Sequence, residues 1–155
     1  MKILILSDSH GEQCYMEQAV LQEKPDCIIH LGDHSRDADT LGQTFPSIPM
    51  LSVAGNCDFA SMAEETLVTD VRGVRFFITH GHRHGVKTNL LRLGYAAQEH
   101  LAQIVLYGHT HVADSRQLGD IHFLNPGACS GAKPSYAVVE IPQQVEFTCR
   151  IEYFL

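Results

Sequence analysis

The chain has 155 residues, of which 45% are hydrophobic and 19% are charged, and this composition excludes a disordered or collagen-like protein. The length predicts a single domain over residues 1–155 that buries a sizeable core without needing disulfides. The formal net charge is −7 and Lys and Arg form no run, so general nucleic-acid binding, which requires a basic surface, is not expected.

The first half of the chain alternates apolar runs with a helix-forming segment. Apolar runs at residues 2–7, 26–31 and 48–54 predict buried strands. Helix formers over residues 12–23 predict a helix that ends near Pro25, and the residues between Gly32 and the third strand predict a loop bracketed by prolines. Such short links are typical of right-handed βαβ crossovers in a parallel sheet.

The second half of the chain predicts short strands in mainly antiparallel order. Residues 65–71 and 74–79 flank Arg72-Gly73, which predicts a hairpin, and the leucines of residues 88–101 have helical spacing. The remaining β-like segments are residues 104–107, 112–118, 121–124, 136–141 and 145–154. The two halves together predict an α/β fold with two mixed sheets and helices on the outside. The apolar C-terminal residues predict either a last strand or a contact with a second copy, so a homo-oligomer stays open.

The cysteines and the first residues bear on where the protein works. The five cysteines are odd in number and form no C-x-x-C pair, which is typical of reduced thiols. The apolar run that starts at Ile3 is too short for a signal sequence or a membrane span. We therefore expect a cytoplasmic protein without a membrane partner.

Aspartate, asparagine and histidine residues follow the ends of five predicted strands. They are Asp8, His10, Asp33, Asn56, His80, His109 and His111. Because ligands of open α/β sheets gather beyond the carboxyl ends of the strands, we expect these side chains to lie together. Such a cluster also explains why the chain has 10 histidines against only 11 Lys and Arg residues.

The donor types and their spacing predict a metal centre. Residues i and i+2 of an extended segment point to one side, so the D-S-H pair and the H-T-H pair are each expected to address one ion. Carboxylate and imidazole donors without thiolate suit Mn, Fe, Ni or Zn. Two carboxylates, four imidazoles and one amide are too many for one tetrahedral site and fit two adjacent divalent ions.

Five motif blocks, taken in this order, resemble the signature of the calcineurin-like metallophosphoesterases. They are D-S-H at 8–10, G-D at 32–33, G-N at 55–56, His80 and G-H-T-H at 108–111. The small size and the variant G-N-C-D at 55–58 are similar to the short bacterial and archaeal phosphodiesterase branch of that superfamily. The resemblance implies a four-layer αββα sandwich of two mixed sheets flanked by helices, and a phosphodiesterase that acts on a small phosphate ester.

The resemblance also implies a role for each matching residue. Asp8, His10 and His111 would hold the first metal ion, Asn56, His80 and His109 the second, and Asp33 would bridge the two. A hydroxide shared by the two ions would attack phosphorus in line while the ions stabilise the developing charge. Mn²⁺ is the expected metal, with Ni²⁺, Fe²⁺, Zn²⁺ and Mg²⁺ as alternatives.

Asn56, His109 and His82 are expected to be catalytic. The Asn56 amide would reach a phosphate oxygen, and His82, in T-H-G-H, is expected to face the same cleft as a general acid or a phosphate ligand. In much of the resembled superfamily the residue after this asparagine is a histidine that protonates the leaving group or steadies the phosphate. Here it is Cys57, and a thiol is a poor proton donor at neutral pH. We therefore expect a preference for good leaving groups, unless another histidine supplies the proton.

Nearby residues have simpler expected roles. His30 lies inside a predicted strand and is expected to be a core histidine. Arg36 is expected to be a solvated loop residue paired with Asp37 or Asp39, with phosphate binding as the alternative. His34 is expected either to neighbour the metal ligands or to be solvated.

Each ligand residue taken singly also has an ordinary explanation, since aspartates cap helices and Gly-Asn pairs form turns. Caps and turns do not require histidine at fixed places, so the joint pattern favours a metal centre. The alternative function is a non-catalytic protein-interaction scaffold with the same fold, as in one retromer subunit. The presence of all four histidine ligands disfavours that alternative.

Overall fold

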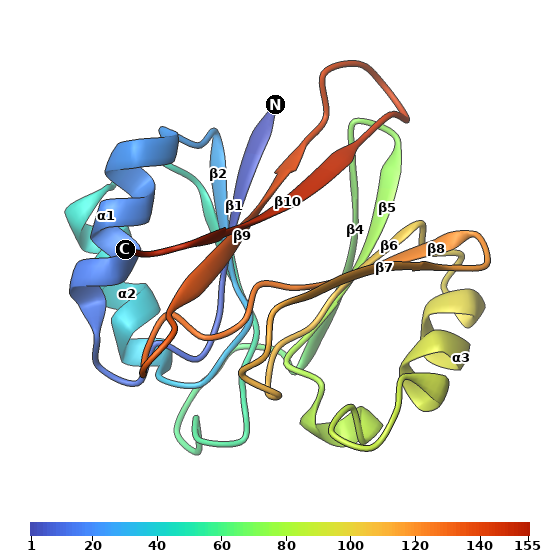
Figure 1. The fold of residues 1–155 in the computed structure, drawn as a ribbon, viewed down its shortest axis with the longest axis horizontal. Helices are drawn as coiled ribbons and strands as arrows, with labels where there is room; N and C mark the ends of the chain where they lie inside the picture. Colours follow the sequence, from blue (N-terminus) through green and yellow to red (C-terminus); the bar gives the residue numbers. More distant parts are fainter.

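Two five-stranded mixed sheets lie face to face in the computed structural model, which describes residues 1–155, and helices cover their outer sides (Figure 1). The first sheet has the order β10-β9-β1-β2-β3 and contains β1 (Lys2–Leu6), β2 (Cys27–His30), β3 (Met50–Ser52), β9 (Ser135–Glu140) and β10 (Thr148–Tyr153). The second has the order β4-β5-β6-β8-β7 and contains β4 (Thr66–Val71), β5 (Val74–Thr79), β6 (Ile104–Leu106), β7 (Asp114–Leu118) and β8 (Ile121–Asn125). The helices are α1 (Gln13–Glu23), α2 (Ser35–Thr44) and α3 (Leu91–Glu99), with a 3-10 turn η1 (His82–His84).

Three hydrophobic clusters join the layers. The central cluster lies between the sheets and includes Ile5 of β1. Its neighbour Leu4 points to the opposite face and packs with Met16 of α1, as the alternation of side chains along a strand requires. The third cluster joins the second sheet to α3 through residues such as Phe77 and Leu93. The structure is therefore the four-layer αββα sandwich that was expected, with α1 and α2 on one side and α3 on the other (Figure 1).

The strand order confirms the parallel first half and corrects the second. β1 runs parallel to β2, and β2 runs parallel to β3. In the second half the expected antiparallel order holds for the β4–β5, β7–β8 and β9–β10 pairs, but β5, β6 and β8 are parallel neighbours, which was not expected. The reason is that α3 carries the chain back between β5 and β6, and the outer strand β7 does so between β6 and β8. The last two strands return to the first sheet, where β9 pairs antiparallel with β1.

Residues 35–44, expected to be part of a loop, form α2. This helix is polar, and only Asp37, Ala38 and Leu41 are buried, so it lacks the apolar stripe by which a sequence reveals a helix. Its first turn is held from outside, because the carboxylate of Asp58 accepts the N–H of Ser35 at 2.7 Å.

Turn residues confirm the hairpin predicted at Arg72-Gly73 and form a second one at Gly119. Arg72 and Gly73 have φ angles of 49° and 80°, as a two-residue turn between twisted strands requires. Gly119, with a φ of 60°, turns the chain between β7 and β8. The third predicted strand is shorter than expected, since β3 covers only Met50–Ser52.

The C-terminal segment forms a strand, one of its two expected roles. β10 pairs with β9, and the ring of Phe154 lies 4.9 Å from that of Tyr15 and 5.0 Å from that of Tyr136. No helix of the structure has the length and apolar character needed to cross a membrane.

A buried carboxylate ties the end of α1 to the first sheet. Glu23 is 7% exposed, and its Oε1 accepts hydrogen bonds from the hydroxyl of Tyr136 at 2.9 Å and from Nη1 of Arg150 at 3.1 Å. Burial opposes the ionisation of Glu23, but the hydrogen bonds from Arg150 and Tyr136 outweigh it and lower its pKa. The negative charge of Glu23 therefore contributes to the attachment of α1.

The substitution Glu23→Gln should lower the free energy of unfolding by roughly 1–3 kcal/mol at neutral pH, because Arg150 and Tyr136 then face a neutral amide. Since the folded pKa of Glu23 is lowered, its stabilisation is complete above the unfolded pKa of about 4.3 and is lost as the pH falls through the folded pKa. Urea unfolding between pH 7 and pH 3 should show the difference shrinking toward acid pH. Glu17→Gln on the same helix is the control, and a difference that does not change with pH would contradict the ionic role.

Candidate metal centre

The loops that follow β1, β2, β3, β5 and β6 converge at one end of the two sheets (Figure 1). Backbone pairing continues just beyond the strand ends, since the N–H of Asp8 donates to the carbonyl of Gly32 at 3.0 Å. In the second sheet the N–H of Gly108 likewise donates to the carbonyl of His80 at 2.9 Å. The sheets thereby bring all the expected ligand residues to one place.

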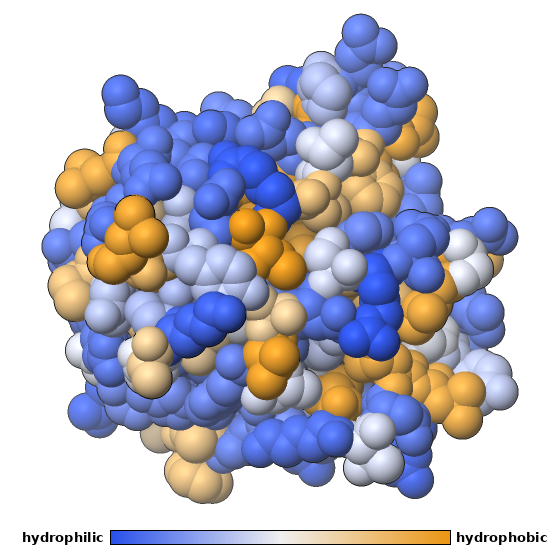
Figure 2. Space-filling model, in the orientation of Figure 1, coloured by the Kyte–Doolittle hydropathy of each residue, from blue (hydrophilic) through white to orange (hydrophobic).

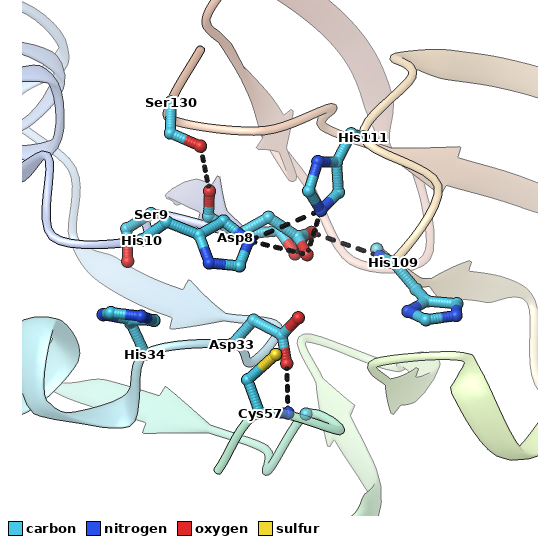
Figure 3. Close-up of polar contacts among 12 residues, drawn as sticks. Asp8, Ser9, His10, Asp33, His34, Cys57, His109, His111 and Ser130 are labelled. Atoms are coloured by element: carbon cyan, nitrogen blue, oxygen red, sulfur yellow. Dashed lines mark hydrogen bonds and ion pairs between the residues drawn. The ribbon is translucent and has the colours of Figure 1, made fainter.

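Asp8, His10, Asp33 and His111 form a first cluster (Figure 3). One donor atom of each residue lies within 4.8 Å of the others. Nε2 of His111 is 3.1 Å from Oδ1 of Asp8 and 3.4 Å from Nε2 of His10. These are the residues expected around the first ion, together with the bridging aspartate.

Asp33 also belongs to a second cluster with His80 and His109, whose donor atoms lie within 4.8 Å of one another. Nε2 of His80 is 3.5 Å from Oδ2 of Asp33 and 3.1 Å from Oδ1 of Asn56. Nδ1 of His80 donates to the carbonyl oxygen of Leu31, 2.7 Å away, which leaves Nε2 facing the cluster. Asp33 is thus common to both clusters, the position that a bridging ligand requires.

The ligand loops have left-handed backbone at positions that are not glycine. Asp8, His10, Asp33, His109 and His111 have φ angles between 45° and 67°, a conformation that costs about 1–2 kcal/mol for such residues. The H-T-H segment is therefore not extended, and the expectation that its two histidines address one ion is wrong. His111 lies in the first cluster and His109 in the second.

Fixed hydrogen bonds orient both aspartates. Oδ2 of Asp8 accepts the N–H of His109 at 3.1 Å and the hydroxyl of Ser7. Oδ1 of Asp33 accepts the N–H of Cys57 at 2.9 Å. The other oxygen of each carboxylate faces the imidazoles, so both are held in a ligand orientation in advance.

The charges and donors of the site fit divalent cations. Burial opposes the ionisation of Asp8 and Asp33, but hydrogen bonds and the charge of nearby histidines outweigh it and lower the pKa of both. Oδ1 of Asp8 is buried and accepts no hydrogen bond of adequate geometry, although three imidazole nitrogens lie between 3.1 and 3.9 Å from it. A carboxylate oxygen so placed needs a cation, and carboxylate with imidazole is the donor set of the transition metals.

Polar residues outside the expected ligand set hold the loops in place. Oδ2 of Asp58 accepts the N–H of Asp33 at 2.9 Å and that of Gly55 at 2.8 Å. Nδ2 of Asn125 donates to the carbonyl of Gly108 at 3.1 Å. Asp58 ends the G-N-C-D motif, but its partners lie up to 25 residues away, so the sequence carried no signal for this role.

A buried chain of hydrogen bonds links the loops after β1 and β2. Nδ1 of His30 accepts the N–H of Gly32 at 3.2 Å, so Nε2 carries the proton and donates to the hydroxyl of Ser9 at 3.3 Å. Ser9 donates in turn to Oδ2 of Asp37 at 2.7 Å, and the same oxygen accepts the N–H of Gly11 at 2.7 Å. The complete burial of His30 confirms that it is a core histidine, whereas no sequence pattern predicted this network.

His82 and Cys57 border the second cluster. The ring of His82 is 5.5 Å from that of His80 and 6.1 Å from that of His109, and its Nδ1 has no hydrogen-bond partner. Cys57 is exposed, and the amide of Asn56 donates to its Sγ at 3.5 Å. Burial and the charge of Asp33 raise the pKa of this thiol, so it remains protonated at neutral pH.

Arg36 is exposed, as expected, but its expected loop position and ion pair are wrong. Arg36 lies in the first turn of α2 instead of a loop and forms no ion pair with its acidic neighbours, because Asp37 is turned toward Ser9 and Gly11. His34 lies beside the first cluster, with its ring 5.2 Å from that of His10 (Figure 3).

Known proteins are similar to this chain in sequence. The profile of the calcineurin-like phosphoesterase superfamily domain matches residues 1–144. The probable metallophosphoesterase YsnB of Bacillus subtilis is 35% identical over 131 residues, which cover 83% of this chain and 75% of that protein. The phosphodiesterase MJ0936 of Methanocaldococcus jannaschii is 28% identical over 153 residues, which cover 84% and 86% of the two chains.

Solved structures agree with these relatives. A predicted phosphoesterase from Streptococcus pneumoniae has a TM-score of 0.78 at 32% identity, with 99% of this chain and 97% of the other covered. Vps29 of Entamoeba histolytica has a TM-score of 0.78 over the full length of both chains, but at 20% identity this likeness concerns the fold alone.

The fold and the two donor clusters define a metal-binding hydrolase of phosphate esters. The matched profile and the similarity to YsnB show that the chain belongs to the calcineurin-like phosphoesterase superfamily.

The substitution Gly108→Ala should weaken metal binding about 10- to 100-fold. An added Cβ at this position would lie 2.1 Å from Oγ of Ser7 and 2.9 Å from Oδ2 of Asp8, so it displaces a carboxylate of the first cluster. Calorimetric titration with Mn²⁺ measures the effect. Gly94→Ala, whose Cβ would meet only Phe123 at 3.7 Å, is the control, and equal Mn²⁺ affinity of Gly108→Ala and the wild type would contradict the role of this close approach.

The substitution Ser9→Ala should reduce both stability and metal affinity. It leaves His30 and Asp37 without their common partner, which lowers the free energy of unfolding by roughly 1–3 kcal/mol. The loosened loops should weaken Mn²⁺ binding about tenfold. Thr40→Ala, which removes an exposed hydroxyl bonded to the carbonyl of Arg36 in α2, should change neither quantity by a comparable amount. Unfolding in urea and Mn²⁺ titration test the two effects separately, and unchanged affinity would show that the network does not position the ligands.

Proposed function

We propose that this chain hydrolyses a small phosphodiester in the cytoplasm at a dinuclear centre of divalent cations, with Mn²⁺ as the expected metal. The observation that carries the proposal is the position of Asp33, whose carboxylate belongs to both donor clusters. A single ion would not need a carboxylate that is shared between two groups of ligand residues.

The chain's residues divide between two ions. Asp8, His10 and His111 would hold one, His80, His109 and Asn56 would hold the other, and Asp33 would hold both. When bound, a pair of divalent cations supplies a water of lowered pKa as the nucleophile and offsets the charge of the phosphate. The net charge of −7 is therefore compatible with an anionic substrate, while the lack of a basic surface favours a small ester over a nucleic acid.

Hydrolysis forms a bond from the water oxygen to phosphorus and breaks a phosphorus–ester oxygen bond, and the leaving oxygen needs a proton. The Asn56 amide, beside the second cluster, donates to the weak acceptor Sγ of Cys57 at 3.5 Å and could donate to a phosphate oxygen instead. His82 and His109 lie on the same side. Since a protonated thiol at position 57 is a weak acid, His82 is the group we assign to the leaving oxygen.

The relatives support hydrolysis more than the scaffold alternative. Vps29 shares the fold, and this likeness is the observation in favour of a protein-interaction role. The complete donor set and the similarity to proteins named metallophosphoesterase and phosphodiesterase support the enzyme. A diester is preferred to a monoester because one such relative is named a phosphodiesterase.

The substitution Asp33→Asn should lower the hydrolysis of bis-p-nitrophenyl phosphate about 10²- to 10³-fold and reduce the bound metal below two ions per chain, because the shared carboxylate is lost. Elemental analysis and p-nitrophenolate release measure the two effects. Asp120→Asn, an exposed position in the turn between β7 and β8, is the control. An active Asp33→Asn protein with two ions would contradict the bridging assignment, and an inactive metal-loaded wild type would favour the scaffold.

A further inference from the structure

A groove of about 720 Å³ begins beside the donor clusters. Its walls are the start of α2 with His34 and Arg36, Ser52 at the end of β3, and residues 57–63 of the β3–β4 loop. Two of its residues touch the metal-ligand residue Asp33, since His34 follows it in sequence and Cys57 donates its N–H to it at 2.9 Å. A phosphate bound at the clusters therefore has one of its substituents at the mouth of this groove.

Two large apolar side chains of the groove are almost completely exposed. Phe59 is 96% exposed and Met62 is 98% exposed, and an apolar side chain left in water forgoes about 1.5–3 kcal/mol of burial. Figure 2 shows apolar atoms projecting at the lower end of the face drawn, where Figure 1 places the β3–β4 loop. These side chains offer an aromatic ring and a polarisable thioether to a ligand.

The loop that carries these side chains is anchored at its base. The carboxylate of Asp58 accepts three backbone N–H groups, from Asp33, Ser35 and Gly55. The N–H of Ala54 also donates to the carbonyl of Glu64 at 2.9 Å, which closes the loop. The base of the loop is thus anchored next to the clusters, and its apolar tip projects from there.

The polar residues of the groove complement a planar substituent. Arg36 is exposed and forms no ion pair, and a guanidinium can stack on a ring or donate to its polar edge. The ring of His34 stands beside His10 at the mouth of the groove. Both oxygens of Asp58 already accept the backbone donors named above.

We propose that this groove binds the non-reacting substituent of the phosphodiester, and that the substituent it favours is a planar aromatic group packed against Phe59 and Met62. This inference rests on the proposed function and adds the chemical class of the substrate. A second cavity, of about 760 Å³, lies between α3 and β7.

Two diesters with the same leaving group test this subsite: phenyl p-nitrophenyl phosphate and methyl p-nitrophenyl phosphate, both with the Mn²⁺-loaded protein. Phe59→Ala should lower kcat/KM about tenfold for the phenyl ester and less than twofold for the methyl ester. Because each variant is compared on both esters, their different intrinsic reactivity cancels. Phe59→Tyr, which keeps the ring, should retain the preference, and Met62→Ala should show a smaller loss of the same kind.

Tyr95→Ala is the matched control, since Tyr95 is a 60% exposed aromatic residue on α3, in the other cavity, and should leave the ratio of the two esters unchanged. Phe59 has almost no contacts to lose, so thermal unfolding of Phe59→Ala should match that of the wild type. Equal effects of Phe59→Ala on both esters, or none on either, would overturn the subsite while leaving the phosphoesterase intact. Failure of the metal-loaded wild type to hydrolyse either ester would refute the proposed function and the subsite with it.

Discussion

Two buried carboxylates that form no ion pair with a lysine or arginine constrain the arrangement of the residues around them. Asp8 and Asp33 lie at adjacent strand ends, and the only basic groups that form ion pairs with either are imidazoles. Burying such charge is costly unless positive charge comes with it. Histidines surround the pair and can supply positive charge. Backbone N–H groups donate to one oxygen of each carboxylate, and the second oxygen of each faces the imidazoles. Seven of the ten histidines of the chain lie in or beside the site: His10, His30, His34, His80, His82, His109 and His111.

The layers of the fold and the location of the site could be predicted because they depend on local patterns. Apolar runs mark the strands of both sheets, and polar ligand types directly after glycines mark their carboxyl ends. α2 escaped prediction because its residues are polar and its first turn is held by Asp58, a residue of another loop. The parallel order of β5, β6 and β8 was not predicted. Strand direction depends on how the connections cross the sheet, and the hydrophobic pattern of a sequence contains no information on this.

The sequence allowed the residues of the site to be predicted. The spacing of these residues along the chain, however, did not predict which of the two clusters each would join. The alternation argument assumes an extended chain, and His109 and His111 are both left-handed. The supporting residues Asp37, Asp58 and Asn125 were not found, since each acts across a long separation in sequence. A polar residue whose side chain forms hydrogen bonds with the backbone of a distant loop cannot be distinguished from other loop residues until the fold is known.

The position of β1 has a consequence for how the molecule reaches its native state. β1 is a central strand whose neighbours come from distant parts of the chain, with Cys27 of β2 on one side and Glu140 of β9 paired to Lys2 on the other. Contacts that close so large a loop form slowly. The hydroxyl of Ser130, just before β9, also donates to the carbonyl of Asp8 at 2.7 Å. The ligand loop after β1 therefore acquires its final support only when a residue 122 positions further along the chain is in place, so the ordering of this loop is coupled to the closure of the first sheet.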